Sequence, residues 1–518
     1  MLNRIPQNKN LYPFVKDLLF QKRIRYIGFR DFTSRRTFMD LRNWIESVRS
    51  LGQLKEVRGA DVQSEIGGIT DIFMDRPGRP ALLFDEIPGY QPGFQVLSNV
   101  ATSKERVALT LFGESKPTGD MELVRALLDL SNSLTPLPPR VVKEGPVLEN
   151  VVTGDDVDLT IFPSPIWHEL DKEPFIGTGS AVIIGDPESD WINVGCYRVA
   201  VHGPQKAGLM ISAGHNGHTL MSRWWDLGKP CPVAISCGHH PLLFMVGGLY
   251  APAGVCEFDL AGGILGEPLP VIEGPYTGLP VPAHSEIVIE GEAVPGELQD
   301  EGPFGEWSGY YAGGRRPAPV IRVKNIMYRN NPIILGVIPR KPPSDNTFYC
   351  TYFNSAEVWK QMEGAGIRGI QGVWMHPASG SRLLTVVSIR QQYPGHAKQA
   401  GMIAAHTITG AYANRYVIVV DDDIDPTNTE EVIWALSTRV EAREDVEFVR
   451  RSWSTALDPM AYAGVDGKPV YNTKMVIDAC IPWDRRNTFP AVSRASKELR
   501  RQLWQRWQGL FEEIGETE

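Results

Sequence analysis

Short apolar runs separated by glycine and proline fill the middle of this chain and limit what it can fold into. Between about Val147 and Val323 these runs include AVIIG, INVGCYRVAVHG, PVAISCG, SEIVIEGEAV and VIRVKNIMYR. Runs of this length that are rich in valine and isoleucine and bounded by turn residues are typical of β-strands. Several of them in succession predict an antiparallel or mixed sheet, which can close into a barrel.

The chain on either side of this stretch mixes helices and strands. Thr37–Val57 and Ser103–Phe112 carry apolar residues at helical spacing, and an apolar strand, Ala81–Phe84, lies between them. Alternating segments follow Pro332: IILGVIP, a helix near Ala356–Glu363, LLTVVSI, a helix near Ala397–Ala411, RYVIVVDDDIDP, and a helix capped near Thr427 or Thr429. Such alternation predicts βαβ units.

These patterns predict an α/β (α+β) protein with four segments. The chain has 518 residues, which is too long for one ordinary core. We expect an N-terminal extension at 1–36, an N-terminal α/β region at 37–146, a β-rich domain at 147–330 and a C-terminal α/β domain at 331–518. The last domain ends in an amphipathic helix, Ala495–Ile514, which packs either on another subunit or on its own domain.

Composition argues against several classes of protein. The formal net charge is −9, which disfavours a nucleic-acid groove or an anionic membrane surface as partner. The six cysteines form no C-x-x-C pair and read as reduced thiols. The N-terminus lacks a secretory apolar core, and no apolar run reaches the length of a membrane span. We therefore expect a cytoplasmic protein.

The stretch Asp300–Trp307, DEGPFGEW, carries the main local signal for chemistry. Glu301 and Glu306 flank a Gly-Pro-Phe-Gly core, which predicts a tight loop. Phe304 and Trp307 would exclude water from these acids and raise their pKa toward neutrality, as a general acid requires. The alternative is a solvated acidic turn, and polar residues upstream bear on that choice.

Those polar residues lie in the β-rich stretch. They are Asn193 in NVGCYR, His215 and His218 in SAGHNGH, and Glu257 in VCEFD. One amide oxygen, one imidazole and one carboxylate suit an octahedral Mn²⁺ or Mg²⁺ and do not suit structural zinc. A histidine in such a turn is also commonly a hydrogen-bonded structural group. On one continuous strand Arg198 would face away from Asn193 unless Gly195 forms a bulge.

Together, six motifs resemble the UbiD family of reversible decarboxylases. They are N-V-G-x-Y-R, a Gly-His turn, G-V-x-E-x-D, I-L-G-E-P-x-P-V, E-G-P-F-G-E and V-x-D-D-D-I-D-P, within a match from about Thr37 to Arg485. The resemblance implies a central split β-barrel that binds prenylated FMN, between an N-terminal α/β region and a C-terminal α/β oligomerisation domain. It also implies that a flavin prenyltransferase supplies the cofactor, that Mn²⁺ and K⁺ hold its phosphate, and that the chain forms a homodimer or homohexamer.

Carried over position by position, the resemblance implies several groups of site residues. Mn²⁺ would be bound by Asn193, His215 and Glu257, with His218 as the alternative to His215. K⁺ would be bound mostly by backbone oxygens, from Val194, Val246, Gly247, Leu249 and Arg439, together with Glu257. The flavin would lie against Asn193, Cys196, Tyr197, Arg198, Ile211, Ser212, Ala213, His215, Asn216 and Gly217, with Arg415 as the base for its phosphate. The catalytic network would be Glu301, Arg198 and Glu306.

These assignments imply a non-oxidative, reversible decarboxylase. Loss of CO₂ from an sp² carbon needs an electron sink, which a cofactor provides where side chains cannot. Glu306 would protonate the resulting carbon, and Arg198 would hold the substrate carboxylate or fix Glu301. Trp307 favours a flat aromatic or heteroaromatic acid, hydroxylated or not, over a prenylated quinone precursor. A thioester substrate stays an alternative.

Three other functions stay open from the sequence. The chain could be a split-barrel oxidoreductase with ordinary FMN, a subunit of a multi-component aryl carboxylase complex, or a non-catalytic homologue within such a complex. The paired glutamates and the metal triad argue against the first. The intact Glu–Arg–Glu set argues against the last.

Overall fold

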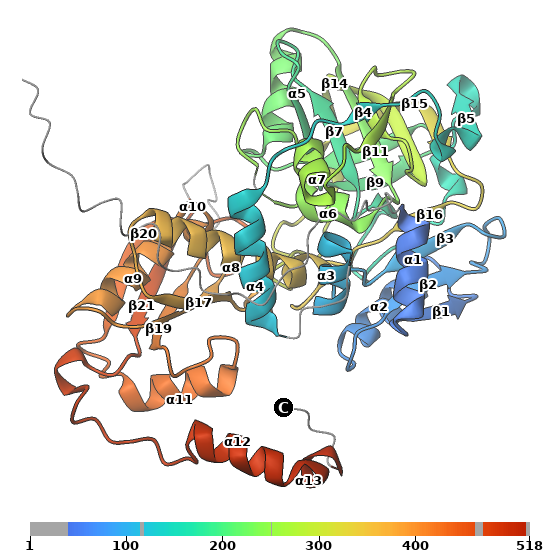
Figure 1. Ribbon diagram of the computed structural model, residues 1–518. Coiled ribbons are helices and arrows are strands. Elements are labelled where there is room, and N and C mark those ends of the chain that lie inside the picture. The colour runs from blue at the N-terminus through green and yellow to red at the C-terminus, as the bar shows by residue number, and fades with distance from the viewer. Residues whose placement is uncertain (1–39, 114–118, 250, 462–469, 514–518) are drawn as a thin grey trace, which may run out of the picture. The chain divides into compact units, whose positions relative to one another are not determined.

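The computed structural model describes residues 40–113, 119–249, 251–461 and 470–513 (Figure 1). The expected extension at 1–36 lies outside these ranges. No helix within them is long and apolar enough to cross a membrane. All six cysteines are free thiols. The cytoplasmic location stays a prediction.

The N-terminal region is built on a four-stranded sheet in the order β1-β2-β3-β16. Its elements are α1 (Leu41–Ser50), β1 (Leu54–Arg58), α2 (Glu65–Met74), β2 (Ala81–Asp85), β3 (Gln95–Ser98), α3 (Lys104–Phe112), α4 (Asp120–Ser133) and the distant β16 (Ile333–Leu335). Ser103 caps α3 by accepting a hydrogen bond from the Arg106 amide. The helical pattern over Thr37–Val57 corresponds to α1, which ends just before Gly52 at φ +69°, and its last residues, Leu54–Val57, instead pair with β2.

The pairing of β16 with β3 returns the chain to the N-terminal sheet after the whole β-rich stretch. The two strands run parallel, and Ile333, Ile334 and Leu335 are buried. The domain boundary expected at residue 330 stays a prediction. The residues just beyond this boundary, Ile333–Leu335 of β16, nevertheless pair with β3 of the N-terminal sheet.

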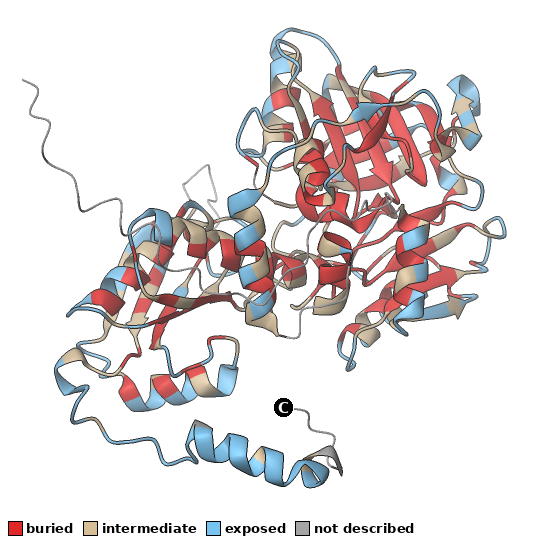
Figure 2. Ribbon diagram, in the orientation of Figure 1, coloured by how far each residue is buried: buried red, intermediate tan, exposed pale blue. Residues whose placement is uncertain are grey.

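The β-rich stretch forms a mostly antiparallel sheet of nine strands, which curls into the predicted half-barrel. Its path is β6-β9-β10-β15-β14-β11-β7-β8, and β5 pairs with β15. The strands are β5 (Asn150–Thr153), β6 (Phe175–Gly177), β7 (Ala181–Gly185), β8 (Ile192–Gly195), β9 (Arg198–Gly203), β10 (Lys206–Met210), β11 (Cys231–Cys237), β14 (Ile287–Glu301) and β15 (Arg316–Tyr328). Figure 2 shows these strands as the most continuously buried part of the chain. A small sheet joins β13 (Pro280–Pro282), β12 (Pro270–Glu273) and β4 (Arg140–Val141).

Three helices interrupt the β-rich stretch, and the sequence predicted none of them. They are α5 (Asn216–Asp226), α6 (Pro241–Gly247) and α7 (Glu257–Leu265). All three contact β8, at one end of the sheet. The two longer helices begin in segments that the sequence assigned to a turn and to an apolar run. Both contain glycines and short polar residues that weaken a helical pattern.

The C-terminal region holds a five-stranded mixed sheet in the order β17-β18-β19-β21-β20. Its strands are β17 (Ile370–Met375), β18 (Leu384–Ile389), β19 (Tyr416–Asp421), β20 (Val446–Trp453) and β21 (Tyr471–Asp478), and its helices are α8 (Asp345–Gly364), α9 (His396–His406), α10 (Ile408–Ala411) and α11 (Thr429–Arg439). The predicted alternation of strand and helix is confirmed. The N-cap of α11 is neither predicted threonine but Asn428, whose side chain accepts from the Glu430 and Glu431 amides.

The last helix is divided, contrary to the single helix predicted from Ala495. The structure has α12 (Lys497–Arg506) and α13 (Gln508–Glu513), with Trp507 between them at φ −116° and ψ 25°. The rings of Trp504 and Phe511 stack across the break at 4.4 Å. Leu503, Trp507 and Leu510 are exposed, and both helices lie apart from the buried core in Figure 2.

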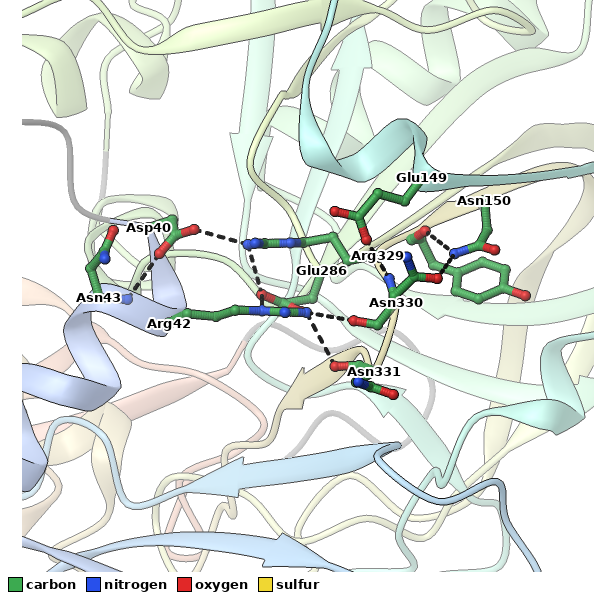
Figure 3. Close-up of polar contacts among 10 residues, drawn as sticks. Asp40, Arg42, Asn43, Glu149, Asn150, Glu286, Arg329, Asn330 and Asn331 are labelled. Carbon is green, nitrogen blue, oxygen red and sulfur yellow. Dashed lines mark hydrogen bonds and ion pairs between the residues drawn. The ribbon is translucent and has the colours of Figure 1, made fainter.

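A buried carboxylate ties the first helix to the central sheet (Figure 3). Glu286, just before β14, accepts hydrogen bonds from Arg42 of α1 at 2.8 and 3.0 Å and from Arg329 at 3.2 Å. Arg329 also pairs with Asp40 at 2.9 Å. Burial raises the pKa of Glu286, and the two arginines oppose that rise. Removal of one partner from such a buried pair is costly, so this network holds α1 against the ends of β14 and β15.

Candidate active site

The acidic stretch forms the loop of the hairpin between β14 and β15. Glu301 is the last residue of β14 and stands opposite Arg316, the first residue of β15. Between them the chain turns back on itself, with hydrogen bonds from the Glu306 amide to the Tyr310 carbonyl and from the Gly309 amide to the Glu306 carbonyl. The predicted tight loop is therefore present, and both carboxyl groups lie at one end of the hairpin.

Arg198 links the two glutamates. Its Nε donates to Glu301 Oε1 at 2.5 Å, and its Nη1 donates to Glu306 Oε1 at 3.1 Å. The guanidinium also lies over the Phe304 ring, 4.7 Å from its centroid. β8 ends at Gly195 and β9 begins at Arg198, so NVGCYR is not one continuous strand. The alternation of faces expected for a single strand therefore does not apply to Asn193 and Arg198. Arg198 lies about a hundred positions before the two glutamates, and the three side chains meet because β9, β10, β15 and β14 are neighbours.

Burial controls the protonation of both acids. The Glu301 side chain is completely buried, and the Glu306 side chain is 12% exposed. Burial raises the pKa of each carboxyl group, and the charges of Arg198 and Arg316 oppose that rise. The sequence predicted this rise from Phe304 and Trp307. Both aromatic residues are buried, and Phe304 packs on Phe175 at 4.4 Å.

The C-terminal region contacts the Glu306 loop through Trp307. Gly380 approaches so closely that a β-carbon there would lie 2.6 Å from Trp307 Cε3, so any larger residue would displace the indole. Arg382 places its guanidinium 4.9 Å from the Trp307 ring centroid. Trp307 is thus packed between the barrel loop and the segment before β18, which keeps water away from the neighbouring carboxyl group.

The expected metal ligands lie on or beside β8, the strand that ends just before Cys196, Tyr197 and Arg198. Asn193 Nδ2 donates to Glu257 Oε1 at 2.8 Å, and the Val194 amide donates to Glu257 Oε2 at 2.7 Å. Both side chains are buried. Burial raises the pKa of Glu257 to about 7, the charge of Asp259 adds to the rise, and the hydrogen bonds from Val194 and Asn193 oppose it. A cation would satisfy this carboxylate if the Asn193 amide turned its oxygen toward it.

His215 stands next to this pair, directly before α5. Its ring meets the edge of the Tyr197 ring at 5.8 Å. The Tyr197 hydroxyl in turn donates to Asn193 Oδ1 at 3.2 Å and accepts from the Gly217 amide at 3.3 Å. Gly195 is required here, because a β-carbon on it would lie 2.3 Å from the Tyr197 ring. A divalent ion held by Asn193, His215 and Glu257 stays a prediction, because the described residues hold no group of three His, Cys, Asp or Glu side chains that could bind a metal.

The backbone groups expected to bind K⁺ partly converge on the same place. The Cys196 amide donates to the Gly247 carbonyl at 2.9 Å, and a β-carbon on Gly247 would lie 3.4 Å from the Val194 carbonyl oxygen. The Leu249 amide donates to the Val246 carbonyl, which closes the end of α6. α5 and α7 also begin here, and their N-termini favour a negatively charged group such as a phosphate.

Two expected site residues are engaged within the C-terminal region. The Arg439 guanidinium pairs with Asp421 and Asp423 beside β19. The Arg415 guanidinium binds both oxygens of the buried Asp458, at 2.6 and 2.8 Å. Both bonds come from one guanidinium nitrogen, Nη2, so the pair does not test the expected role of Arg415 with the flavin phosphate. The predicted role of the Arg439 carbonyl stays untested.

The sequence missed three residues near the two acids. Arg382 and Arg316 are described above. His202 lies on β9 four residues after Arg198, and its buried Nε2 has no hydrogen-bond partner in the described chain. Arg316 could have been found, since a hairpin that closes over Gly313 and Gly314 sets it opposite Glu301. Arg382 and His202 carry no local signal.

We expect Arg198→Met to destabilise the fold by about 3–5 kcal/mol near pH 8, because it leaves a buried carboxylate without its cation. Burial already raises the pKa of Glu301, and loss of Arg198 raises it further above the unfolded value of about 4.3. The folded state then binds more protons than the unfolded chain, so stability falls as pH rises through that window. Urea unfolding near pH 5 should show a smaller loss.

The double variant Arg198→Met/Glu301→Gln should regain most of the stability near pH 8, because the amide needs no cation. Arg322→Met is a matched control, since Arg322 lies on β15 in an exposed pair with Glu297. A loss that is equal at both pH values and is not rescued would show that Arg198 acts by packing alone.

Three family models match nearly the whole chain. They are the N-terminal, Rift-related and C-terminal domains of 3-octaprenyl-4-hydroxybenzoate carboxy-lyase (UbiD), at residues 45–129, 140–342 and 347–479. The chain is 32% identical over 425 residues to pyrrole-2-carboxylic acid decarboxylase of Pseudomonas aeruginosa. The alignment covers 79% of this chain and 85% of that protein.

Solved structures agree with these sequence matches. The UbiD-class enzyme HmfF from Pelotomaculum thermopropionicum, in complex with FMN, superposes with a TM-score of 0.77 at 30% identity, over 89% of this chain and 98% of that one. Vanillic acid decarboxylase of Sedimentibacter hydroxybenzoicus superposes with a TM-score of 0.80 at 28% identity, over 92% and 100%. With its three domain models, its curated relative and its fold in agreement, the chain belongs to the UbiD family.

Proposed function

We propose that this protein is a UbiD-type carboxy-lyase that reversibly removes the carboxyl group of an aromatic or heteroaromatic acid, without net oxidation. The observation that carries the proposal is the buried Arg198 held between Glu301 and Glu306. An arginine shared by two buried acids favours a state in which one acid keeps its proton. A group that can donate a proton to carbon is what the second half of a decarboxylation requires.

Glu306 is the proposed proton donor. It lies in the hairpin loop and keeps slight exposure, whereas Glu301 is completely buried at the end of β14. A proton on Glu306 can therefore reach a bound substrate, while Glu301 fixes Arg198 through the shorter of the two hydrogen bonds. Arg198 orients Glu306 and stabilises the Glu306 carboxylate that forms when the proton is transferred.

Prenylated FMN is the proposed cofactor, made by a separate flavin prenyltransferase. When bound, it supplies the electron sink for the charge left by departing CO₂. A UbiD-class neighbour is an evolved dimeric HmfF in complex with prFMN, at a TM-score of 0.74 and 28% identity. Residues between Tyr197 and Gly217 would hold the flavin. Arg382 is a better candidate than Arg415 for the phosphate, because its charge acts on His215 and it has no carboxylate partner among the described residues.

The substrate class is supported by relatives and by Trp307. The relatives include decarboxylases of pyrrole-2-carboxylic, vanillic and 3,4-dihydroxybenzoic acid, all small ring acids. Trp307 is buried next to Glu306 and takes up space there, which favours a flat ring over a long chain. In the reverse direction the second substrate is CO₂.

Glu306→Gln tests this function. The amide keeps the size and most hydrogen bonds but cannot give up a proton, so turnover should fall by roughly 10²–10⁴ while flavin stays bound. In deuterated buffer the wild type should place deuterium at the former carboxyl position, and the variant should not do so at a comparable rate. Normal turnover and exchange in the variant would transfer the donor role to Glu301. A wild type loaded with prenylated FMN that releases CO₂ from none of the ring acids would refute the function.

We further propose that Asn193, His215 and Glu257 hold a Mn²⁺ that binds the cofactor phosphate, with K⁺ nearby. The buried Glu257, contacted only by neutral donors, supports this proposal. His215→Ala and Glu257→Ala should each lower the manganese and flavin content to roughly a tenth or less, since loss of a metal-site group typically costs 10–100-fold in affinity. Elemental analysis measures the manganese content, and absorbance measures the flavin content. His218→Ala is the control, and an effect of that change alone would make His218 the ligand.

The protein is also proposed to assemble with further copies of itself, as a dimer or hexamer, through α12. Leu499 and Leu503 lie one turn apart on this helix and are exposed, as are Trp507 and Leu510. A chain that ends at Thr488 should therefore give a smaller particle in light scattering. An unchanged number of subunits per particle would rule out this helix as the contact.

A further inference from the structure

Arg316 is a cation without an anion at the edge of the proposed site. No hydrogen bond or ion pair engages its guanidinium within the part of the chain that the structure describes, and its Nε is buried without a partner. Its neighbour Arg315 differs, since it donates to the Gly302 and Asp300 carbonyls and pairs with Glu173. Arg315 therefore stabilises the hairpin, and Arg316 does not.

The end of the Arg316 side chain lies beside Glu306. A β-carbon built on Gly313 would be 3.4 Å from Glu306 Oε1, 3.9 Å from Arg316 Nη2 and 3.9 Å from Leu457 Cδ2. Glu306, Arg316 and Leu457 therefore all approach Gly313. The charge of Arg316 also acts on both acids, lowering the pKa of Glu301 and of Glu306.

Arg198 cannot serve as the general anion-binding group of this site. Two of its nitrogens already donate to the glutamates, and Phe304 covers its face. Arg316 keeps its donors free and has a planar fork that matches a carboxylate or phenolate oxygen. A charged group held partly out of water without a partner is unfavourable, so an anionic ligand would stabilise it.

We propose that Arg316 is a specificity-determining residue that binds a second acidic oxygen group on the substrate ring, a carboxylate or an ionised hydroxyl other than the departing carboxyl. The proposal rests on the proposed function. The departing carboxyl must lie where Glu306 can reach the carbon that it leaves, next to Arg198. A second substituent on the same ring then lies near Gly313, where Arg316 provides charge and Leu457 provides apolar contact.

Matched pairs of ring acids test this proposal. Furan-2-carboxylate is compared with furan-2,5-dicarboxylate, and benzoate with 3,4-dihydroxybenzoate, in the wild type, Arg316→Met, Arg316→Lys and the control Arg322→Met. For the acid of each pair that carries the second acidic group, Arg316→Met should raise KM and lower kcat/KM by roughly 10–100-fold, the size of one charge-assisted contact. Arg316→Lys should recover part of the lost kcat/KM. The monoacids should lose clearly less than the other acid of each pair, because for them Arg316 acts only through the pKa of Glu301 and Glu306, and the control should change less than about twofold.

Calorimetry keeps the test independent of turnover. The decarboxylated product that retains the second group, catechol, should bind the wild-type holoenzyme more tightly than Arg316→Met by a similar factor. An equal loss for monoacids and diacids would assign Arg316 to the departing carboxyl, and no change in affinity would remove it from the site. Either result overturns the proposal. Wild-type holoenzyme that turns over none of the acids would instead refute the proposed function, and the calorimetric comparison would still decide the role of Arg316.

Discussion

The ion pairs of Arg198 with Glu301 and Glu306 set the chemistry of the site. Two acids this close and this dry cannot both carry charge unless a cation lies between them. Arg198 provides that cation from the first position of β9. The two carboxyl groups therefore titrate as a coupled pair, and Arg198 influences the pKa of both. The half-barrel sheet makes this possible, because its strand order brings β9 within two strands of the hairpin that carries both acids.

The rest of the site adjoins these three residues along the chain. Asn193 lies on β8, and only Cys196 and Tyr197 separate the end of that strand from Arg198 at the start of β9. Two helices begin by β8, with His215 directly before one and Glu257 at the start of the other. The residues suited to a phosphate and its cations therefore lie close along the chain to those suited to proton transfer.

Much of this arrangement could be predicted from the sequence, and the exceptions have physical reasons. The β-rich middle and the alternating C-terminal strands were predicted because apolar periodicity is a local property. The raised pKa of Glu306 was predicted because its aromatic neighbours adjoin it in sequence. The helices α5 and α7 were missed because tertiary contacts with β8, and not local propensity, stabilise them. Arg382 and His202 were missed because nothing near them in sequence reflects contacts made across the fold.

The pairing of β16 with β3 has a consequence for how the chain reaches its native state. The N-terminal sheet lacks its last strand until residues 333–335 have left the ribosome, more than two hundred positions after β3. Until then β3 exposes an unpaired edge, which is a site for wrong strand pairing. Contacts between residues so distant in sequence also form slowly. The N-terminal region is therefore unable to mature independently during synthesis, and the half-barrel must be made before that sheet is complete.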